Sequence, residues 1–131
     1  MKQKILVVDD EASVRETIRL QLKSTGHEII EAEDGQQAIS LLGSSNNRGI
    51  SVIICDVRMP NITGIEAVSH FRRDHPSIPV IVLTGYPDVK LAVDFVAKGV
   101  FDYVVKPVEK ERLIAKVEKA AIQSAAMKVL D

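Results

Sequence analysis

The chain has 131 residues, of which 46% are hydrophobic and 27% are charged, and its formal net charge is −1. This length suits a single domain spanning residues 1–131, and the near-neutral charge argues against a protein that binds nucleic acid or a membrane surface. No stretch is long and apolar enough to cross a bilayer, no secretory signal opens the chain, and the one cysteine, Cys55, has no disulfide partner. We therefore expect a soluble, cytoplasmic protein.

Short apolar runs alternate with amphipathic patterns along the whole chain. We expect strands over residues 4–8, 28–31, 51–55, 79–83 and 101–105. We expect helices over about 11–25, 36–43, 64–74, 87–99 and 109–128. This alternation predicts an α/β fold with a doubly wound, five-stranded parallel sheet of order 2-1-3-4-5 and five helices, a flavodoxin-like arrangement in which 28–31 is the polar edge strand.

Apolar residues at helical spacing indicate how several helices are oriented. The series are Val14, Ile18 and Leu22 in the first helix, Ile65, Val68 and Phe71 facing inward in the third, and Val89, Val93 and Val96 in the fourth, with Pro87 in its first turn.

Four of the expected strands end on polar residues that suit phosphoryl chemistry. The first runs into Asp9 and Asp10, the third into Asp56, the fourth into Thr84 and the fifth into Lys106. Ligands of open α/β sheets bind outside the carboxyl ends of the strands, so we expect these side chains to converge at one edge of the sheet.

This set of side chains has a coherent chemistry. Asp56 is the candidate nucleophile, because a carboxylate can attack a phosphoryl group to give a mixed anhydride. Three carboxylates in one small site repel one another, and Mg²⁺, which prefers oxygen ligands, would compensate their charge. Lys106 can reach a phosphoryl oxygen as a point charge, and Thr84 offers a hydroxyl donor.

Each residue also has an ordinary structural interpretation. Asp10 could cap the first helix, Asp56 could be an acid at the start of a loop, Thr84 a strand-end hydroxyl and Lys106 a solvated lysine. Their joint placement after separate strands of one sheet favours the functional interpretation.

With these residues in place, the chain resembles a CheY-like response-regulator receiver domain of bacterial two-component signalling, over essentially its whole length. The segments that support the resemblance are Ile5–Glu11, Asp56–Pro60 with Gly64, Leu83–Gly85 and Tyr103–Pro107.

The resemblance implies a phosphorelay function in which Asp56 accepts phosphate from a sensor histidine kinase or a phosphotransfer protein. It implies that Asp10, Asp56 and the backbone carbonyl of Arg58 bind Mg²⁺, with Asp9 contributing through a metal-bound water. On this view the chain is a signalling switch rather than an enzyme, and catalyses only its own phosphotransfer and autodephosphorylation.

The resemblance also implies a switch pair and a cis peptide bond. Phosphate would draw the Thr84 hydroxyl inward, the Tyr103 ring would follow, and the face formed by the fourth helix, fifth strand and fifth helix would change. That face contains Val89, Leu91 and Val100 and could dock a partner. The cis bond would join Lys106 to Pro107.

Some positions depart from the common family pattern. Ile62 and Thr63 stand where Met-Asp is frequent, which affects only the loop. Arg58 and Tyr86 each follow a site residue by two positions, and we expect them to flank the phosphoryl group and tune its lifetime, in a direction that the sequence leaves open.

Other functions remain open on the sequence alone. Residues 91–103 resemble receivers of NtrC-type transcriptional regulators, so the chain is either a stand-alone receiver or part of a longer regulator that controls a downstream effector. Residues 1–131 contain no effector domain, so we expect no direct nucleic-acid binding by them. A phosphorylation-dependent homodimer stays open.

Two other functions fit the sequence less well. A flavodoxin-like cofactor binder would have a Gly-rich phosphate loop after the first strand, and this chain has Asp9 and Asp10 there. An aspartyl-phosphate hydrolase would have a second acid at position 58, where Arg58 stands.

Overall fold

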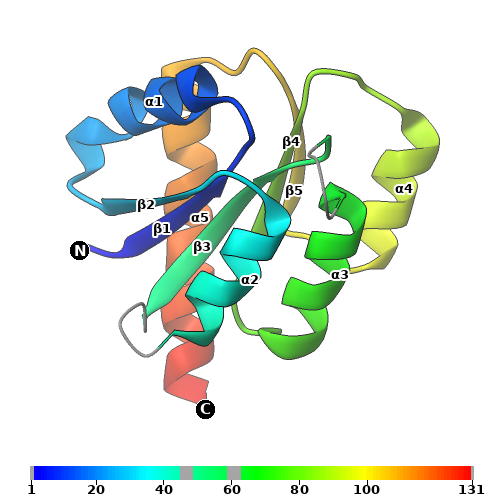
Figure 1. The fold of residues 1–131 in the computed structure, drawn as a ribbon. Coiled ribbons are helices and arrows are strands. Elements are labelled where there is room, and N and C mark those ends of the chain that lie inside the picture. The colour runs from blue at the N-terminus through cyan, green and yellow to red at the C-terminus, as the bar shows by residue number, and fades with distance from the viewer. Residues whose placement is uncertain (1, 45–48, 59–62, 131) are drawn as a thin grey trace.

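The computed structural model describes residues 2–44, 49–58 and 63–130 (Figure 1). Its strands are β1 (Lys4–Val8), β2 (Glu28–Ala32), β3 (Ile50–Asp56), β4 (Val80–Thr84) and β5 (Asp102–Val105). Its helices are α1 (Ala12–Gln21), α2 (Gly35–Gly43), α3 (Gly64–Asp74), α4 (Val89–Ala97) and α5 (Lys110–Leu130), with a 3₁₀ turn, η1, at Lys23–Thr25. No helix in these ranges has both the length and the apolar content needed to span a membrane.

The strands form one parallel sheet of order β2-β1-β3-β4-β5, which confirms the predicted topology. Val8 lies opposite both Ala32 and Cys55, and Thr84 lies opposite Val105, so the strands end nearly level with one another. The three central strands are buried along almost their entire length, as expected of continuous apolar runs covered on both faces. The residues that come directly after these strands in the chain therefore lie at a common edge of the sheet.

Helices cover both faces of the sheet, α1 and α5 on one and α2, α3 and α4 on the other (Figure 1). On the first face, Ile18, Leu113 and Val117 pack against alternate residues of the central strands. On the second, Phe71 and Phe95 pack against the intervening residues. Successive side chains of each strand point to opposite faces of the sheet, so the hydrophobic core consists of two layers, one on each face.

The first helix is shorter than the predicted span of 11–25. It ends at Gln21 and is followed by η1, in which the amides of Thr25 and Gly26 donate to carbonyls three residues earlier. Gly26 has a φ of 76°, a left-handed conformation that glycine adopts without strain. The tightened turn brings the chain directly into β2.

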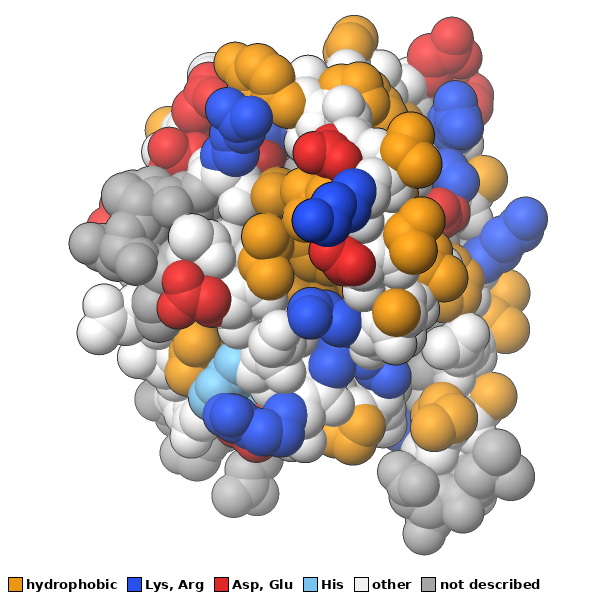
Figure 2. All heavy atoms as spheres, turned by 90° about the vertical axis from the view of Figure 1, so that its right-hand side faces the viewer, with side chains coloured by type: hydrophobic (Ala, Val, Ile, Leu, Met, Phe, Trp, Pro, Cys, Tyr) orange, Lys and Arg blue, Asp and Glu red, His pale blue; other side chains and the backbone are white. Residues whose placement is uncertain are grey.

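The fourth helix differs from the prediction at its start, and its apolar residues point in several directions. Pro87 precedes the helix, and the Asp88 carboxylate caps it by accepting a hydrogen bond from the amide of Leu91 at 3.2 Å. Phe95 is buried against the sheet, whereas three valines are 61–83% exposed on other sides of α4, namely Val89, Val93 and Val96. In Figure 2, hydrophobic side chains gather on the side of the molecule where α4 lies. These three valines are called the α4 valines below.

In the third helix, Val68 and Phe71 face inward as predicted, but Ile65 does not. Its buried stripe consists of Gly64, Ala67, Val68 and Phe71, at positions i, i+3, i+4 and i+7. Ile65 is 39% exposed, because it lies about 100° around the helix from Gly64, at the margin of this stripe.

Candidate functional site

Three aspartates come together at the carboxyl ends of β1 and β3. Asp9 follows β1, Asp10 comes next in the chain, and Asp56 is the last residue of β3. One carboxylate oxygen from each lies within 4.8 Å of the others. Asp9 and Asp56 are buried and Asp10 is exposed, so the cluster opens to solvent on the Asp10 side.

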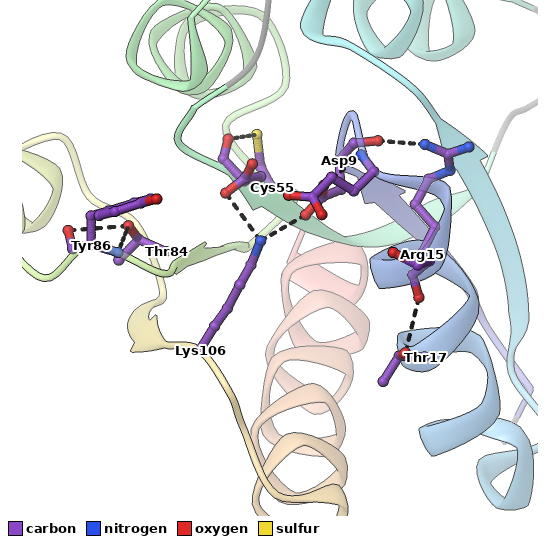
Figure 3. A network of polar contacts seen from close by, with 10 residues as sticks. Asp9, Arg15, Thr17, Cys55, Thr84, Tyr86 and Lys106 are labelled. Carbon is purple, nitrogen blue, oxygen red and sulfur yellow. Dashed lines mark hydrogen bonds and ion pairs between the residues drawn. The ribbon is translucent and has the colours of Figure 1, made fainter.

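Lys106 reaches into this cluster from the end of β5. Its Nζ donates to Asp9 Oδ2 at 2.9 Å and to Asp56 Oδ1 at 3.3 Å (Figure 3). Its backbone amide donates to the Thr84 carbonyl at 2.7 Å, which anchors the lysine beside the end of β4. The peptide bond between Lys106 and Pro107 is cis.

Burial and neighbouring charges set the ionisation of these groups. The pKa of Asp56 is raised by burial and by the negative charge of Asp9, although Lys106 acts in the opposite direction. Burial disfavours the charged form of Lys106, but its hydrogen bond to Asp9 and the charges of both acids outweigh burial and raise its pKa. The lysine is therefore a fixed positive charge beside an acid that burial makes less acidic than usual.

Asp9 and Asp10 have different surroundings despite being adjacent. The Asp9 carboxylate accepts hydrogen bonds from the amide of Glu11 at 2.9 Å and from Lys106. Asp10 accepts no hydrogen bond from any residue that the structure describes. It is not a helix cap either, because α1 begins at Ala12 with Glu11 at the N-cap position. The interpretation of Asp10 as a structural cap is therefore wrong, and its carboxylate is available to a ligand.

Thr84 is placed at the same edge, but its hydroxyl is engaged locally. Oγ1 donates to the Tyr86 carbonyl at 3.2 Å and accepts from the Tyr86 amide at 3.0 Å (Figure 3). It makes no hydrogen bond to Asp56 or Lys106. A hydroxyl has a single proton, so donating to any other acceptor would cost Thr84 its bond to the Tyr86 carbonyl.

Tyr103, the other member of the expected switch pair, connects β5 to α4. It is half-buried, and its ring centroid lies 6.1 Å from that of Phe95. Its hydroxyl accepts a hydrogen bond from the amide of Asp88, the N-cap residue of α4, at 3.4 Å. A movement of this ring would thus act directly on the start of α4.

Comparison with known families identifies the chain. The model of the response regulator receiver domain matches residues 5–118. The chain belongs to the response regulator receiver family. Membership supersedes the alternatives of a flavodoxin-like cofactor binder and an aspartyl-phosphate hydrolase.

Curated relatives and solved structures agree with this assignment. The chain is 34% identical to the transcriptional regulatory protein ZraR of Escherichia coli and 32% identical to the DNA-binding transcriptional regulator NtrC of Salmonella typhimurium, in each case over 88% of its length. It covers 26% of ZraR and 24% of NtrC, and so spans about a quarter of these relatives. A response regulator receiver domain protein from Clostridium thermocellum superposes with a TM-score of 0.87 at 29% identity, covering 95% of this chain and 98% of that one.

The acidic cluster of this receiver domain suits a hard divalent cation. Receiver domains generally bind Mg²⁺ at an acidic pocket, and the three aspartates provide oxygen donors of the type that Mg²⁺ prefers. Both oxygens of Asp9 accept hydrogen bonds from protein donors, whereas the Asp10 carboxylate accepts none from the described residues and Lys106 binds only one oxygen of Asp56. The Arg58 carbonyl remains a predicted ligand.

The β3–α3 connection of the receiver domain returns close to Asp56. The amide of Gly64 donates to the Val57 carbonyl at 2.9 Å. A Cβ added at Gly64 would lie 2.4 Å from the Asp56 carbonyl oxygen, so a glycine is required at this close approach. Met59, Pro60 and Ile62 of this connection lie outside the described residues.

One contact at the site was missed by sequence reasoning. Arg15, in the first turns of α1, donates from Nη1 to the Asp9 backbone carbonyl at 2.6 Å (Figure 3). The available signal was an arginine five residues after Asp10 on a helix that starts beside the acids. Its target is a backbone atom, which no side-chain pattern reveals.

Proposed function

We propose that Asp56 of this receiver domain accepts a phosphoryl group from a sensor histidine kinase or phosphotransfer protein, in a reaction that depends on Mg²⁺. The observation that carries the proposal is the buried Asp56 carboxylate beside Lys106, within a cluster of three acids at the carboxyl edge of the sheet. A structural ion pair would not require the additional exposed carboxylate of Asp10.

The transfer needs few protein groups. An Asp56 oxygen forms a bond to phosphorus while the bond from phosphorus to the donor's histidine nitrogen breaks, and that nitrogen keeps the electron pair. Lys106 holds one Asp56 oxygen in place and offers its positive charge to the incoming phosphoryl oxygens. Asp10, Asp56 and the Arg58 carbonyl would hold Mg²⁺, with Asp9 contributing through a water, and the ion would supply positive charge to neutralise the phosphoryl oxygens. A groove of about 520 Å³, lined in part by Asp10, Arg58 and Leu91, gives a donor access.

We infer that the phosphorylated state is transmitted through Thr84 and Tyr103. The Thr84 hydroxyl exchanges its donated bond to the Tyr86 carbonyl for one to the phosphoryl group, and the Tyr103 ring moves with it, releasing the amide of Asp88. The equilibrium shift alters the face formed by α4, β5 and α5, where the α4 valines are exposed. Moving an equilibrium from 1:99 to 99:1 takes about 5.5 kcal/mol, so Lys106 and the binding of a partner contribute alongside Thr84.

Residues 1–131 act as one cytoplasmic receiver domain that controls an effector domain or protein and has no activity beyond its own phosphotransfer and autodephosphorylation. The similarity to ZraR and NtrC favours an NtrC-like regulator as the source of that effector. We propose that residues 1–131 do not bind nucleic acid directly, and that a phosphorylation-dependent homodimer is one possible form of the output.

The test is the intact mass after incubation with acetyl phosphate and Mg²⁺. We expect one added phosphoryl group in the wild-type chain, and none in Asp56→Asn or in a metal-free sample. Addition to Asp56→Asn, or equal addition without metal, would contradict the assigned acceptor or the metal requirement respectively.

A further inference from the structure

A chain of polar contacts links the edge strand β2 to the Asp9 backbone through α1. Arg15 donates from Nε to Glu31 Oε1 at 2.9 Å and from Nη1 to the Asp9 carbonyl at 2.6 Å. Its side chain is only 15% exposed although it is charged. Arg19 pairs with the other oxygen of Glu31 and does not touch the acidic cluster. The guanidinium thus bridges two fixed points, one of which belongs to the site.

A contact to the Asp9 carbonyl affects the orientation of Asp10. This carbonyl belongs to the peptide group that joins Asp9 to Asp10. Because a peptide group is planar, holding its carbonyl also fixes the orientation of the Asp10 amide and Cα. The amide of Asp9 is already held by the Ala32 carbonyl at 3.1 Å. Asp10 has no side-chain partner among the described residues, so its carboxylate is positioned by the backbone alone.

We propose that Arg15, held by Glu31, is a positioning residue for the divalent-cation site, orienting the Asp9–Asp10 peptide so that the Asp10 carboxylate is directed toward Asp56. The inference rests on the proposed function, since it concerns the same metal site. Arg15 touches neither the metal nor the phosphoryl group and acts only through the backbone. Groups that orient metal ligands in this way commonly change metal affinity by 10-fold or more when they are removed.

The test compares Mg²⁺ affinity in matched variants by isothermal titration calorimetry without a phosphodonor. Arg15→Lys keeps the charge but cannot donate in two fixed directions, so we expect its Mg²⁺ dissociation constant to rise about tenfold. Arg19→Lys alters a pair to the same Glu31 and should leave the constant unchanged. Glu31→Ala should weaken Mg²⁺ binding in the same direction as Arg15→Lys, because it frees the guanidinium.

A second measurement separates positioning from general destabilisation. At saturating Mg²⁺, Arg15→Lys should be phosphorylated by acetyl phosphate within about twofold of the wild-type rate, because Asp56 and Lys106 are untouched. If Arg15→Lys lowers the melting temperature but leaves the Mg²⁺ dissociation constant equal to that of Arg19→Lys, the residue is merely structural and the inference is overturned. If the wild-type chain itself binds no Mg²⁺, the proposed function fails and the inference fails with it.

Discussion

The guanidinium carbon of Arg58 lies 4.0 Å from the centroid of the Tyr86 ring, a cation–π contact between the loops that follow β3 and β4. The two residues follow Asp56 and Thr84 by two positions each, in separate parts of the sequence. Because they touch, we infer that they cover the proposed phosphorylation site as one unit rather than as two independent side chains.

This contact predicts coupled effects on the lifetime of phosphorylated Asp56. Arg58→Ala and Tyr86→Ala should each change the rate of dephosphorylation, and the double variant should differ from the product of the single effects by about two- to fivefold, the equivalent of 0.5–1 kcal/mol for an exposed cation–π pair. Tyr86→Phe keeps the ring and is the control. Unchanged rates in both single variants, measured by loss of the phosphorylated mass over time, would refute a role in lifetime.

Lys106→Met should nearly abolish phosphorylation of Asp56. The substitution leaves Asp9 Oδ2 and Asp56 Oδ1 without their shared donor and removes the positive charge from the incoming phosphoryl group. We expect the rate to fall about a hundredfold or more, as for the loss of a donor to a developing anion, and stability to fall by about 1–3 kcal/mol. Intact mass and urea unfolding measure the two effects. Lys116→Met is the control, because it removes an ion pair between α5 and Asp102 of β5, and Asp56 should be phosphorylated normally in this variant.

Thr84→Val should uncouple phosphorylation from the response of Tyr103. The valine keeps the shape of the buried side chain but cannot donate to a phosphoryl oxygen, whereas Thr84→Ser retains the hydroxyl. The chain has two tyrosines, so a Tyr86→Phe background leaves Tyr103 as the single reporter. Its ring signals in NMR should move on phosphorylation with Thr or Ser at position 84 and stay in place with Val. Movement of the ring in the Val variant would exclude Thr84 as the trigger.

Glu31 should stabilise the fold in a pH-dependent manner. The hydrogen bond from Arg19 lowers the pKa of Glu31 from the ordinary value of 4.5, with a further contribution from Arg15 against the opposing effect of burial. A carboxylate with a lowered folded-state pKa stabilises the protein above its unfolded pKa, and that stability is lost as the pH falls through the folded value. Glu31→Gln should therefore be less stable than wild type at pH 7.

The difference between Glu31→Gln and wild type should shrink as the pH falls below 4.5 through the lowered pKa, as measured by urea unfolding across this range. Glu16→Gln, on the exposed side of α1, provides the matched control and should show no such convergence. A stability difference that is constant with pH would contradict the assigned ion pairs.

Val93→Asp should impair output without affecting phosphorylation. Val93, one of the α4 valines, is 61% exposed, so a charge there costs the folded state little, and α4 contributes no residue to the cluster of Asp9, Asp10 and Asp56. We expect normal phosphorylation by intact mass and loss of any phosphorylation-dependent dimer by analytical ultracentrifugation. A dimer that survives Val93→Asp would place its interface on another surface.

The fold and the acidic cluster could be predicted from sequence because their signals are local. A buried parallel strand reads as a continuous apolar run, and the residue that follows it is known once the run is found. Right-handed crossovers then restrict the strand order, which places Asp9, Asp56, Thr84 and Lys106 at one edge. The sequence therefore determined which side chains lie at this edge.

Their mutual orientation was decided only by tertiary structure. The exposure of the α4 valines follows from which side of the helix meets the sheet, and the sequence alone, with apolar residues on several sides of α4, did not settle this. The turn between the Thr84 hydroxyl and the Tyr86 backbone depends on the course of the loop. Arg15 meets the Asp9 carbonyl because α1 packs beside β2, where Glu31 holds the guanidinium. Contacts to backbone atoms leave no pattern in the sequence, since every residue has the same carbonyl, and only the packed fold selects one of them.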